Sequence, residues 1–184
     1  MTRSFLFVLA STRTGGNTEA LARRAARHLP AGASERWLRL VDHPLPPFAD
    51  TRHSTGYAPP DGNARLVCDA TLAATDLVIA TPVYWYSVAW PAKLYLDHWS
   101  AWMRIPELAF AKTLEGRTLW AIVVDSDDDD TTGSSLPVVD TLRRTAEYMH
   151  MRWPGALVGH GNRPGEIERD TAALAAADRY FTGA

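Results

Sequence analysis

Short, almost wholly apolar runs alternate along the chain with stretches in which apolar residues recur every three or four positions. The runs predict buried strands, and the recurring positions predict helices that pack on one face. We expect strands at 5–10, 36–41, 77–80, 118–124 and 156–159, and helices at 18–29, 64–74, 90–103, 136–149 and 166–181. The stretch 43–63 is rich in proline and glycine, so it is expected to form a long loop.

Strands that alternate with helices predict an α/β fold, a three-layer sandwich in which a parallel sheet carries helices on both faces. Five strands fit the order 2-1-3-4-5. The chain of 184 residues shows no internal repeat and no linker, so 1–184 is expected to be a single domain. Ligands of such sheets bind outside the carboxyl ends of the strands, which here means after Ala10, Ala80 and Val124.

The turn after the first strand has the composition of an anion-binding loop, since Ser11, Arg13, Gly16, Asn17 and Thr18 follow one another directly before a helix. The first N–H groups of a helix are unpaired and favour an anion. The lysine of nucleoside-triphosphatase loops and the spaced glycines of dinucleotide-binding loops are both missing. A single terminal phosphate, as in a mononucleotide, fits best. The alternative is that Asn17 or Thr18 is a helix N-cap and the glycines form an ordinary turn.

The loop expected after the third strand is strongly aromatic. It reads Pro82, Val83, Tyr84, Trp85 and Tyr86, followed by a serine and a valine. Because the strand order places this loop beside the first one, its rings are expected to enclose a flat ligand. The alternative is that the aromatic side chains pack under neighbouring loops or against a partner subunit.

These two loops, together with the spacing Lys93-x-x-x-Asp97, resemble the NADPH-dependent FMN reductase family of flavodoxin-like proteins, and the resemblance follows the element order of the whole chain. It implies a flavodoxin-like fold with FMN as cofactor. Phosphate would be bound by Ser11, Arg13, Gly16, Asn17 and Thr18, and the isoalloxazine ring by Pro82, Val83, Tyr84 and Trp85. Ser126, in the loop after the fourth strand, is included among the expected cofactor-binding residues.

The resemblance also implies an activity, that of an FMN-dependent NAD(P)H oxidoreductase. Members take a hydride from NADPH or NADH and pass electrons to a quinone, an azo compound, a metal ion or free flavin. No side chain need act as an acid or base, so no catalytic residue is expected. Two other functions stay open: a flavodoxin-like electron carrier, and a non-enzymatic dimeric domain that has lost the flavin.

Two features depart from the family pattern. Ala10 stands where members often have glycine. The loop that begins at Asp125 carries four further aspartates at 127–130, where many relatives are rich in glycine. Carboxylates facing the ring would repel the phosphates of NADPH, so this run is expected to face solvent. It lacks the glycine and glutamate that a calcium-binding loop requires.

The composition of the chain mostly excludes kinds of partner and of site. A net charge of −2 gives no electrostatic reason to bind nucleic acid or an acidic membrane, and no apolar stretch is long enough for a signal peptide or a membrane span. The only cysteine, Cys68, cannot form an internal disulfide, which suits the cytoplasm, and it is expected to be buried in a helix. Six histidines show no metal-ligand spacing. His160 is expected in a surface turn, and the alternative is that it approaches the flavin side.

The helix expected at 90–103 is apolar on more than one side, so it should be buried on more than one side. One side meets the sheet. The other is expected to meet a second subunit in a homodimer, unless the loop 43–63 covers it.

Overall fold

The computed structural model describes residues 2–127 and 133–182. Within them the strands are β1 (Ser4–Leu9), β2 (Ser34–Arg39), β3 (Asp76–Tyr84), β4 (Ser87–Val88), β5 (Thr118–Asp125) and β6 (Ala156–His160). The α-helices are α1 (Asn17–Ala26), α2 (Gly62–Ala73), α3 (Trp90–Trp102), α4 (Phe110–Leu114), α5 (Leu136–Tyr148) and α6 (Thr171–Ala177). Short 3-10 turns are η1 (Leu40–Asp42), η2 (Pro106–Leu108) and η3 (Glu166–Arg169).

The main sheet is parallel, with the strand order β2-β1-β3-β5-β6, and β4 pairs antiparallel with the end of β3. This confirms the expected order, because the fourth and fifth predicted strands are β5 and β6. The chain runs from one side of β1 to the other between β2 and β3. Consequently the carboxyl ends of β1 and β3 lie side by side, with Leu9 opposite Ala80.

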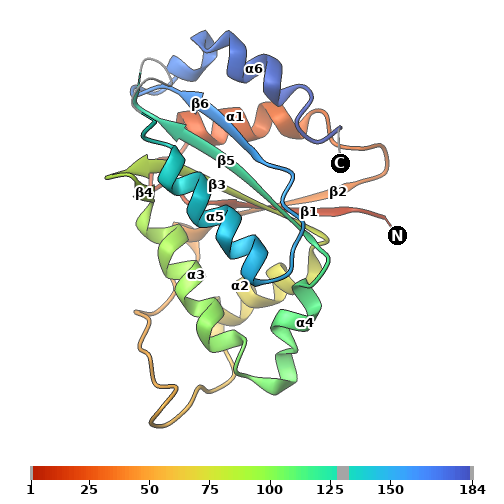
Figure 1. Cartoon of the computed structure of the whole chain (residues 1–184), viewed down its shortest axis with the longest axis vertical. Helices are drawn as coiled ribbons and strands as arrows, with labels where there is room; N and C mark the ends of the chain where they lie inside the picture. The colour runs from red at the N-terminus through yellow and green to blue at the C-terminus, as the bar shows by residue number, and fades with distance from the viewer. Residues whose placement is uncertain (1, 128–132, 183–184) are drawn as a thin grey trace.

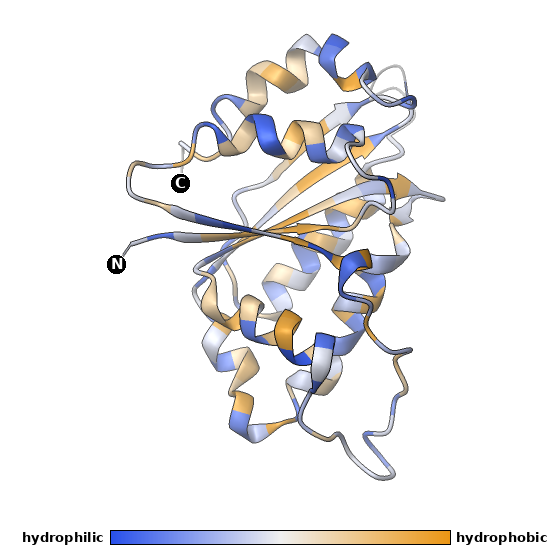
Figure 2. Ribbon diagram, turned by 180° about the vertical axis from the view of Figure 1, so that it is seen from behind, coloured by the Kyte–Doolittle hydropathy of each residue, from blue (hydrophilic) through white to orange (hydrophobic). Residues whose placement is uncertain are grey.

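Helices cover both faces of the sheet, as Figure 1 shows: α1 and α6 lie on one face, and α2, α3, α4 and α5 on the other. Each interface has its own apolar cluster. Phe5, Phe7 and Trp120 belong to the cluster under α1 and α6, whereas Tyr95 and Trp102 belong to the other. The central strands are hydrophobic along much of their length (Figure 2). β5 is buried at every position, which explains why its sequence is a continuous apolar run.

The structure differs from the sequence prediction at several elements. Helix α4 was not predicted, and the strand expected at 36–41 ends at Arg39, where η1 follows. The third strand was expected to end at Ala80, but β3 continues to Tyr84 and turns back into β4, so the predicted loop is a β-hairpin. Trp85 and Tyr86 close this hairpin with left-handed φ angles of 52° and 58°. The last predicted helix is divided into η3 and α6, because the side chain of Asp170 accepts a hydrogen bond from the Ala173 N–H and begins a new helix there.

The long loop between η1 and α2 covers part of α3. The Pro46 carbonyl lies 2.9 Å from Nε2 of His98, and the Phe48 ring meets the His98 ring edge-on at 5.8 Å. The loop 43–63 therefore covers part of the apolar helix, which is one of the two possibilities that the sequence left open for its second side. Trp90, the first residue of α3, stays 60% exposed.

Two further observations concern the cysteine and the lengths of the helices. Cys68 is buried in α2, as expected, and burial raises the pKa of its thiol to about 12, so it stays protonated. None of the helices in the described parts of the chain combines the length and apolar character that crossing a membrane requires.

Candidate functional site

A hollow of about 300 Å³ lies at the carboxyl ends of β1, β3 and β5. Its walls come from four segments that are far apart in the sequence: the loop before α1, the β3–β4 hairpin, the end of β5 and the loop after β6. It contains all ten residues that the sequence singled out: Ser11, Arg13, Gly16, Asn17, Thr18, Pro82, Val83, Tyr84, Trp85 and Ser126. Sequence reasoning did not include Asp125, Gly161, Asn162 and Pro164, which also line it.

The buried carboxylate of Glu19 stabilises the loop before α1. Glu19 accepts a hydrogen bond from the Gly15 N–H at 3.0 Å and forms ion pairs with Arg23 and with Arg39 of β2. Arg39 also donates to the carbonyl of Arg13. The loop therefore keeps its shape through contacts with β2 and α1, without a ligand.

Glu19 gives this support a pH dependence. Burial works against its ionisation, but hydrogen bonds from the two arginines and the loop N–H outweigh burial and lower its pKa from 4.5 to about 2. Because the folded pKa lies below the unfolded one, the stabilisation is complete above about pH 4.5 and is lost as the pH falls towards 2. Between about pH 5 and 2, the free energy of unfolding should fall by about 1–3 kcal/mol more in the wild type than in Glu19→Gln, measured by urea denaturation. Parallel curves for the two proteins would contradict this role.

Asn17 joins the loop before α1 to the loop after β6. Its side chain is 8% exposed and donates to the carbonyls of Gly161 and Arg163, both at 2.9 Å. Its Oδ1 accepts the N–H of Gly165 at 2.9 Å. Position 161 must be glycine, since a Cβ there would lie 2.8 Å from the Asn17 amide nitrogen. The amide group of Asn17 is thus occupied by the protein, and the backbone N–H is what it can offer to a ligand.

The start of α1 fits an anion. Gly16 occupies the N-cap and provides no side-chain cap, so the sequence alternative of an Asn17 or Thr18 cap is wrong. Within the described residues, no acceptor bonds the N–H groups of Asn17 or Thr18. Ser11 is buried beside them, and its Oγ accepts the Arg13 N–H at 3.1 Å, which leaves its hydroxyl proton available. The side chain of Arg13 is exposed, and within the described residues it makes one long hydrogen bond, to the Asn162 carbonyl at 3.4 Å.

The β3–β4 hairpin forms the opposite wall. A two-residue turn with both φ angles positive matches the twist of a hairpin but normally takes asparagine and glycine. Trp85 and Tyr86 are bulky, so this turn stores roughly 1–3 kcal/mol at each position. Trp85 is 94% exposed, although it lines the hollow. Strain combined with exposed aromatic rings is typical of a segment shaped for a ligand or a partner.

The loop after β5 begins with a buried carboxylate. Asp125 is 4% exposed, and its Oδ1 lies 2.7 Å from Nδ1 of His160. The expectation that the aspartates of this loop face solvent is therefore wrong for Asp125, and His160 ends β6 instead of lying in a surface turn. Asp127 is half-buried, and the remaining aspartates, 128–130, lie outside the described residues. Three acidic, histidine or cysteine side chains that could hold a metal ion do not meet anywhere in the described parts of the chain.

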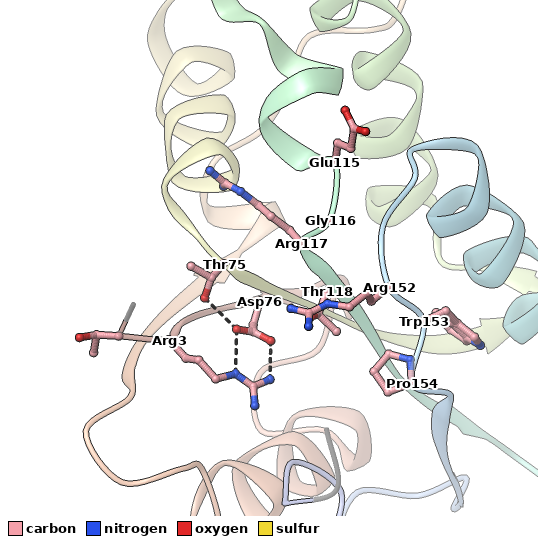
Figure 3. Close-up of a pocket in the computed structure, with 11 residues that line it drawn as sticks. Arg3, Thr75, Asp76, Glu115, Gly116, Arg117, Thr118, Arg152, Trp153 and Pro154 are labelled. Carbon is pink, nitrogen blue, oxygen red and sulfur yellow. Dashed lines mark hydrogen bonds and ion pairs between the residues drawn. The ribbon is translucent and has the colours of Figure 1, made fainter.

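A larger hollow, about 750 Å³, lies at the other edge of the sheet, among the amino ends of the strands (Figure 3). Its central charges are engaged in holding the fold. Arg3 is paired with the buried Asp76 at 2.6 Å. Arg117 donates to the carbonyls of Leu72 and Ala74 at the end of α2. Size alone therefore does not identify the ligand site, and the smaller hollow lies where this topology places ligands.

Comparison with known proteins shows which family this chain resembles. The model of the NADPH-dependent FMN reductase family matches residues 4–162. A curated relative from Bacillus subtilis (strain 168), the putative NAD(P)H-dependent FMN-containing oxidoreductase YwqN, is 33% identical over 172 residues, 92% of each chain. Among solved structures, the Trp repressor binding protein from Bacillus subtilis superposes with a TM-score of 0.77 at 27% identity, over 98% of this chain and 99% of that one. RosB with bound 8-demethyl-8-formylriboflavin-5'-phosphate shares the fold, with a TM-score of 0.71 at 15% identity, over 98% and 76% of the two chains.

The chain belongs to the NADPH-dependent FMN reductase family. It is accordingly an oxidoreductase with FMN as cofactor and a nicotinamide as electron donor. The hollow fits that cofactor, because free N–H groups and an unpaired hydroxyl proton at one end suit a phosphate and exposed aromatic rings at the other suit a flat ring system. When bound, FMN supplies the hydride and electron transfer, and the protein supplies binding, orientation and electrostatics.

Proposed function

We propose that this hollow is the FMN site and that the chain, as one domain, passes electrons from NADPH or NADH through FMN to a small-molecule acceptor. A quinone, an azo compound, a metal ion or free flavin would serve as that acceptor. The observation that carries the proposal is the meeting of the anion-binding loop and the aromatic hairpin, 64 or more positions apart in the sequence, in one hollow.

In this arrangement Ser11, Arg13, Gly16 and Thr18 bind the phosphate, with Asn17 contributing its N–H. Pro82, Val83, Tyr84 and Trp85 lie along the ring system, and Ser126 closes the third side. No side chain has to transfer a proton, since the donor and the cofactor exchange a hydride directly. The protein's task is to hold the two reactants in contact and to leave one face of the ring open.

Steady-state turnover tests the activity. The protein, purified after flavin supplementation, should be yellow and should oxidise NADPH or NADH in the presence of a quinone. A yellow protein that takes no electrons from either nicotinamide would instead be an electron carrier. A colourless protein without turnover would be the non-enzymatic domain that the sequence left open.

Arg13 supplies the test of the phosphate end. Arg13→Ala should weaken the binding of FMN by about tenfold, since a charge-assisted hydrogen bond is worth about 1.5–3 kcal/mol. Riboflavin lacks the phosphate, so its affinity should change little. Flavin fluorescence titrations of both variants measure this, with the exposed Thr14→Ala as control in the same loop. Equal losses for FMN and riboflavin would refute the role assigned to Arg13.

We further propose that the protein is a homodimer of the cytoplasm. Four exposed aromatic side chains support the dimer: Tyr84, Trp85, Tyr86 and Trp90. A cluster of large exposed rings beside a ligand site is typical of a subunit interface. Light scattering at micromolar concentration should give the mass of a dimer for the wild type and of a monomer for Trp90→Asp. A wild-type monomer would contradict the proposal. The lone buried thiol suits a reducing compartment.

A further inference from the structure

We propose that His160 is a positioning residue for flavin reduction: as an imidazolium it neutralises the buried Asp125 carboxylate in the wall of the site, so that this carboxylate does not oppose the negative charge of the reduced cofactor. The inference rests on the proposed FMN site. It gives a role to a residue that the sequence analysis expected in a surface turn and that lies at the end of the last strand.

The first observation is where the carboxylate lies. Asp125 is the last residue of β5, it is 4% exposed, and it lines the same hollow as Ser11 and Pro82. A carboxylate at this depth is poorly screened by water, so its field reaches whatever occupies the hollow.

The second observation is how the carboxylate is held. One oxygen lies 2.7 Å from His160 Nδ1 and accepts the Asp127 N–H at 3.2 Å, and the other accepts the Ser134 hydroxyl at 3.1 Å. A carboxylate only accepts, so Nδ1 carries a proton towards it. The Asp125 carbonyl also accepts the Gly161 N–H at 2.9 Å. Asp125 is thus fixed from both ends of its own loop and from β6.

The surroundings of His160 favour its protonated form. Asp125 faces the ring from β5, and Asp170 of the α6 N-cap accepts the His160 backbone N–H at 2.9 Å. The hollow of about 420 Å³ that His160 lines shares Ser126, Gly161 and Asn162 with the proposed flavin site. It is also lined by Asp127, Glu166 and Arg169. Among the described residues that line this hollow, carboxylates outnumber arginines, and carboxylates stabilise an imidazolium.

The chemistry gives this pair a purpose. A hydride from NAD(P)H adds two electrons to FMN and releases NAD(P)⁺, and the reduced ring system carries a negative charge near neutral pH. An uncompensated carboxylate in the wall would weaken the binding of reduced FMN more than the binding of oxidised FMN. With His160 protonated, the pair has no net charge and this penalty disappears.

His160→Gln separates charge from structure, because an amide keeps a donor for Asp125 but carries no charge. The variant should bind oxidised FMN as the wild type does and reduced FMN about tenfold more weakly. This lowers the two-electron midpoint potential of the bound FMN by about 30 mV. His160→Gln/Asp125→Asn removes the carboxylate as well and should restore the wild-type potential. His28→Gln is the matched control, since His28 pairs with Asp178 on the far side of α1 and should leave the potential unchanged.

A second measurement needs no flavin. In the FMN-free protein, ¹⁵N NMR of the His160 ring at pH 7 should show both nitrogens protonated, and in Asp125→Asn it should show a neutral ring. An unchanged potential in His160→Gln, no restoration in the double variant, or a neutral His160 ring in the wild type would each overturn the proposal. A protein that binds no FMN would refute the proposed function instead, and the NMR result would still decide the charge of the pair.

Discussion

Replacing Asn17 by alanine is expected to reduce FMN affinity by at least tenfold and to lower the free energy of unfolding by about 2–4 kcal/mol. The amide group of Asn17 bonds four backbone groups of the segment 161–167, three at 2.9 Å and one at 3.4 Å. Alanine leaves buried donors and acceptors unpaired, which costs about 1–3 kcal/mol for each group that water cannot reach. It also releases the loop before α1 from the loop after β6.

Two measurements check this expectation. Urea denaturation gives the loss of stability, and flavin fluorescence titration gives the loss of affinity. Thr14→Ala is the matched control, because Thr14 is exposed in the same loop and should change neither quantity appreciably. An Asn17→Ala protein with wild-type FMN affinity would show that the loop before α1 binds FMN without its hydrogen bonds to the loop after β6.

The largest loss of stability is expected from Asp76→Ala, about 3–5 kcal/mol. Asp76 is 1% exposed and accepts hydrogen bonds from Arg3 at 2.6 and 3.1 Å and from the indole N–H of Trp120 at 3.0 Å (Figure 3 shows the pair with Arg3). Burial opposes its ionisation, but these hydrogen bonds prevail and lower the pKa of its carboxyl below the usual value. Alanine would remove an acceptor from the half-buried guanidinium of Arg3 and leave the buried indole N–H of Trp120 without its acceptor.

Thermal and urea unfolding measure the effect, and the exposed pair of Arg65 and Asp69 provides the comparison. Asp69→Ala should cost at most about 1 kcal/mol. Because Asp76 lies at the amino edge of the sheet, the FMN affinity of the folded Asp76→Ala protein should stay at the wild-type value. A marked loss of affinity would mean that the two edges of the sheet are coupled, which this account does not foresee.

The fold could be predicted because its signals are local. Each central strand is a short apolar run, and each crossover helix has a periodic apolar face, so strand order followed from the alternation. The hairpin could not be predicted in the same way. Its turn contains tryptophan and tyrosine where the usual signal is asparagine and glycine, so nothing local marks Trp85 and Tyr86 as turn residues.

The candidate site was predictable in its parts and less so in its connections. The residue types before α1 indicate an anion, which a single loop can reveal. The partners of Asn17 lie 144 and more positions away, and the partner of Asp125 lies 35 positions away. Such pairs depend on which strands become neighbours, and no local pattern encodes them. The sequence therefore predicted that the whole acidic loop after β5 is exposed, although the carboxylate of Asp125 is buried.

The most direct test of the central claim is a fluorescence titration of the flavin-free wild type with FMN and, separately, with riboflavin. We expect saturable binding of one FMN per chain, with an affinity at least tenfold above that of riboflavin, since the phosphate meets the start of α1 and Arg13. Absence of saturation with FMN, or equal affinity for the two flavins, would contradict it.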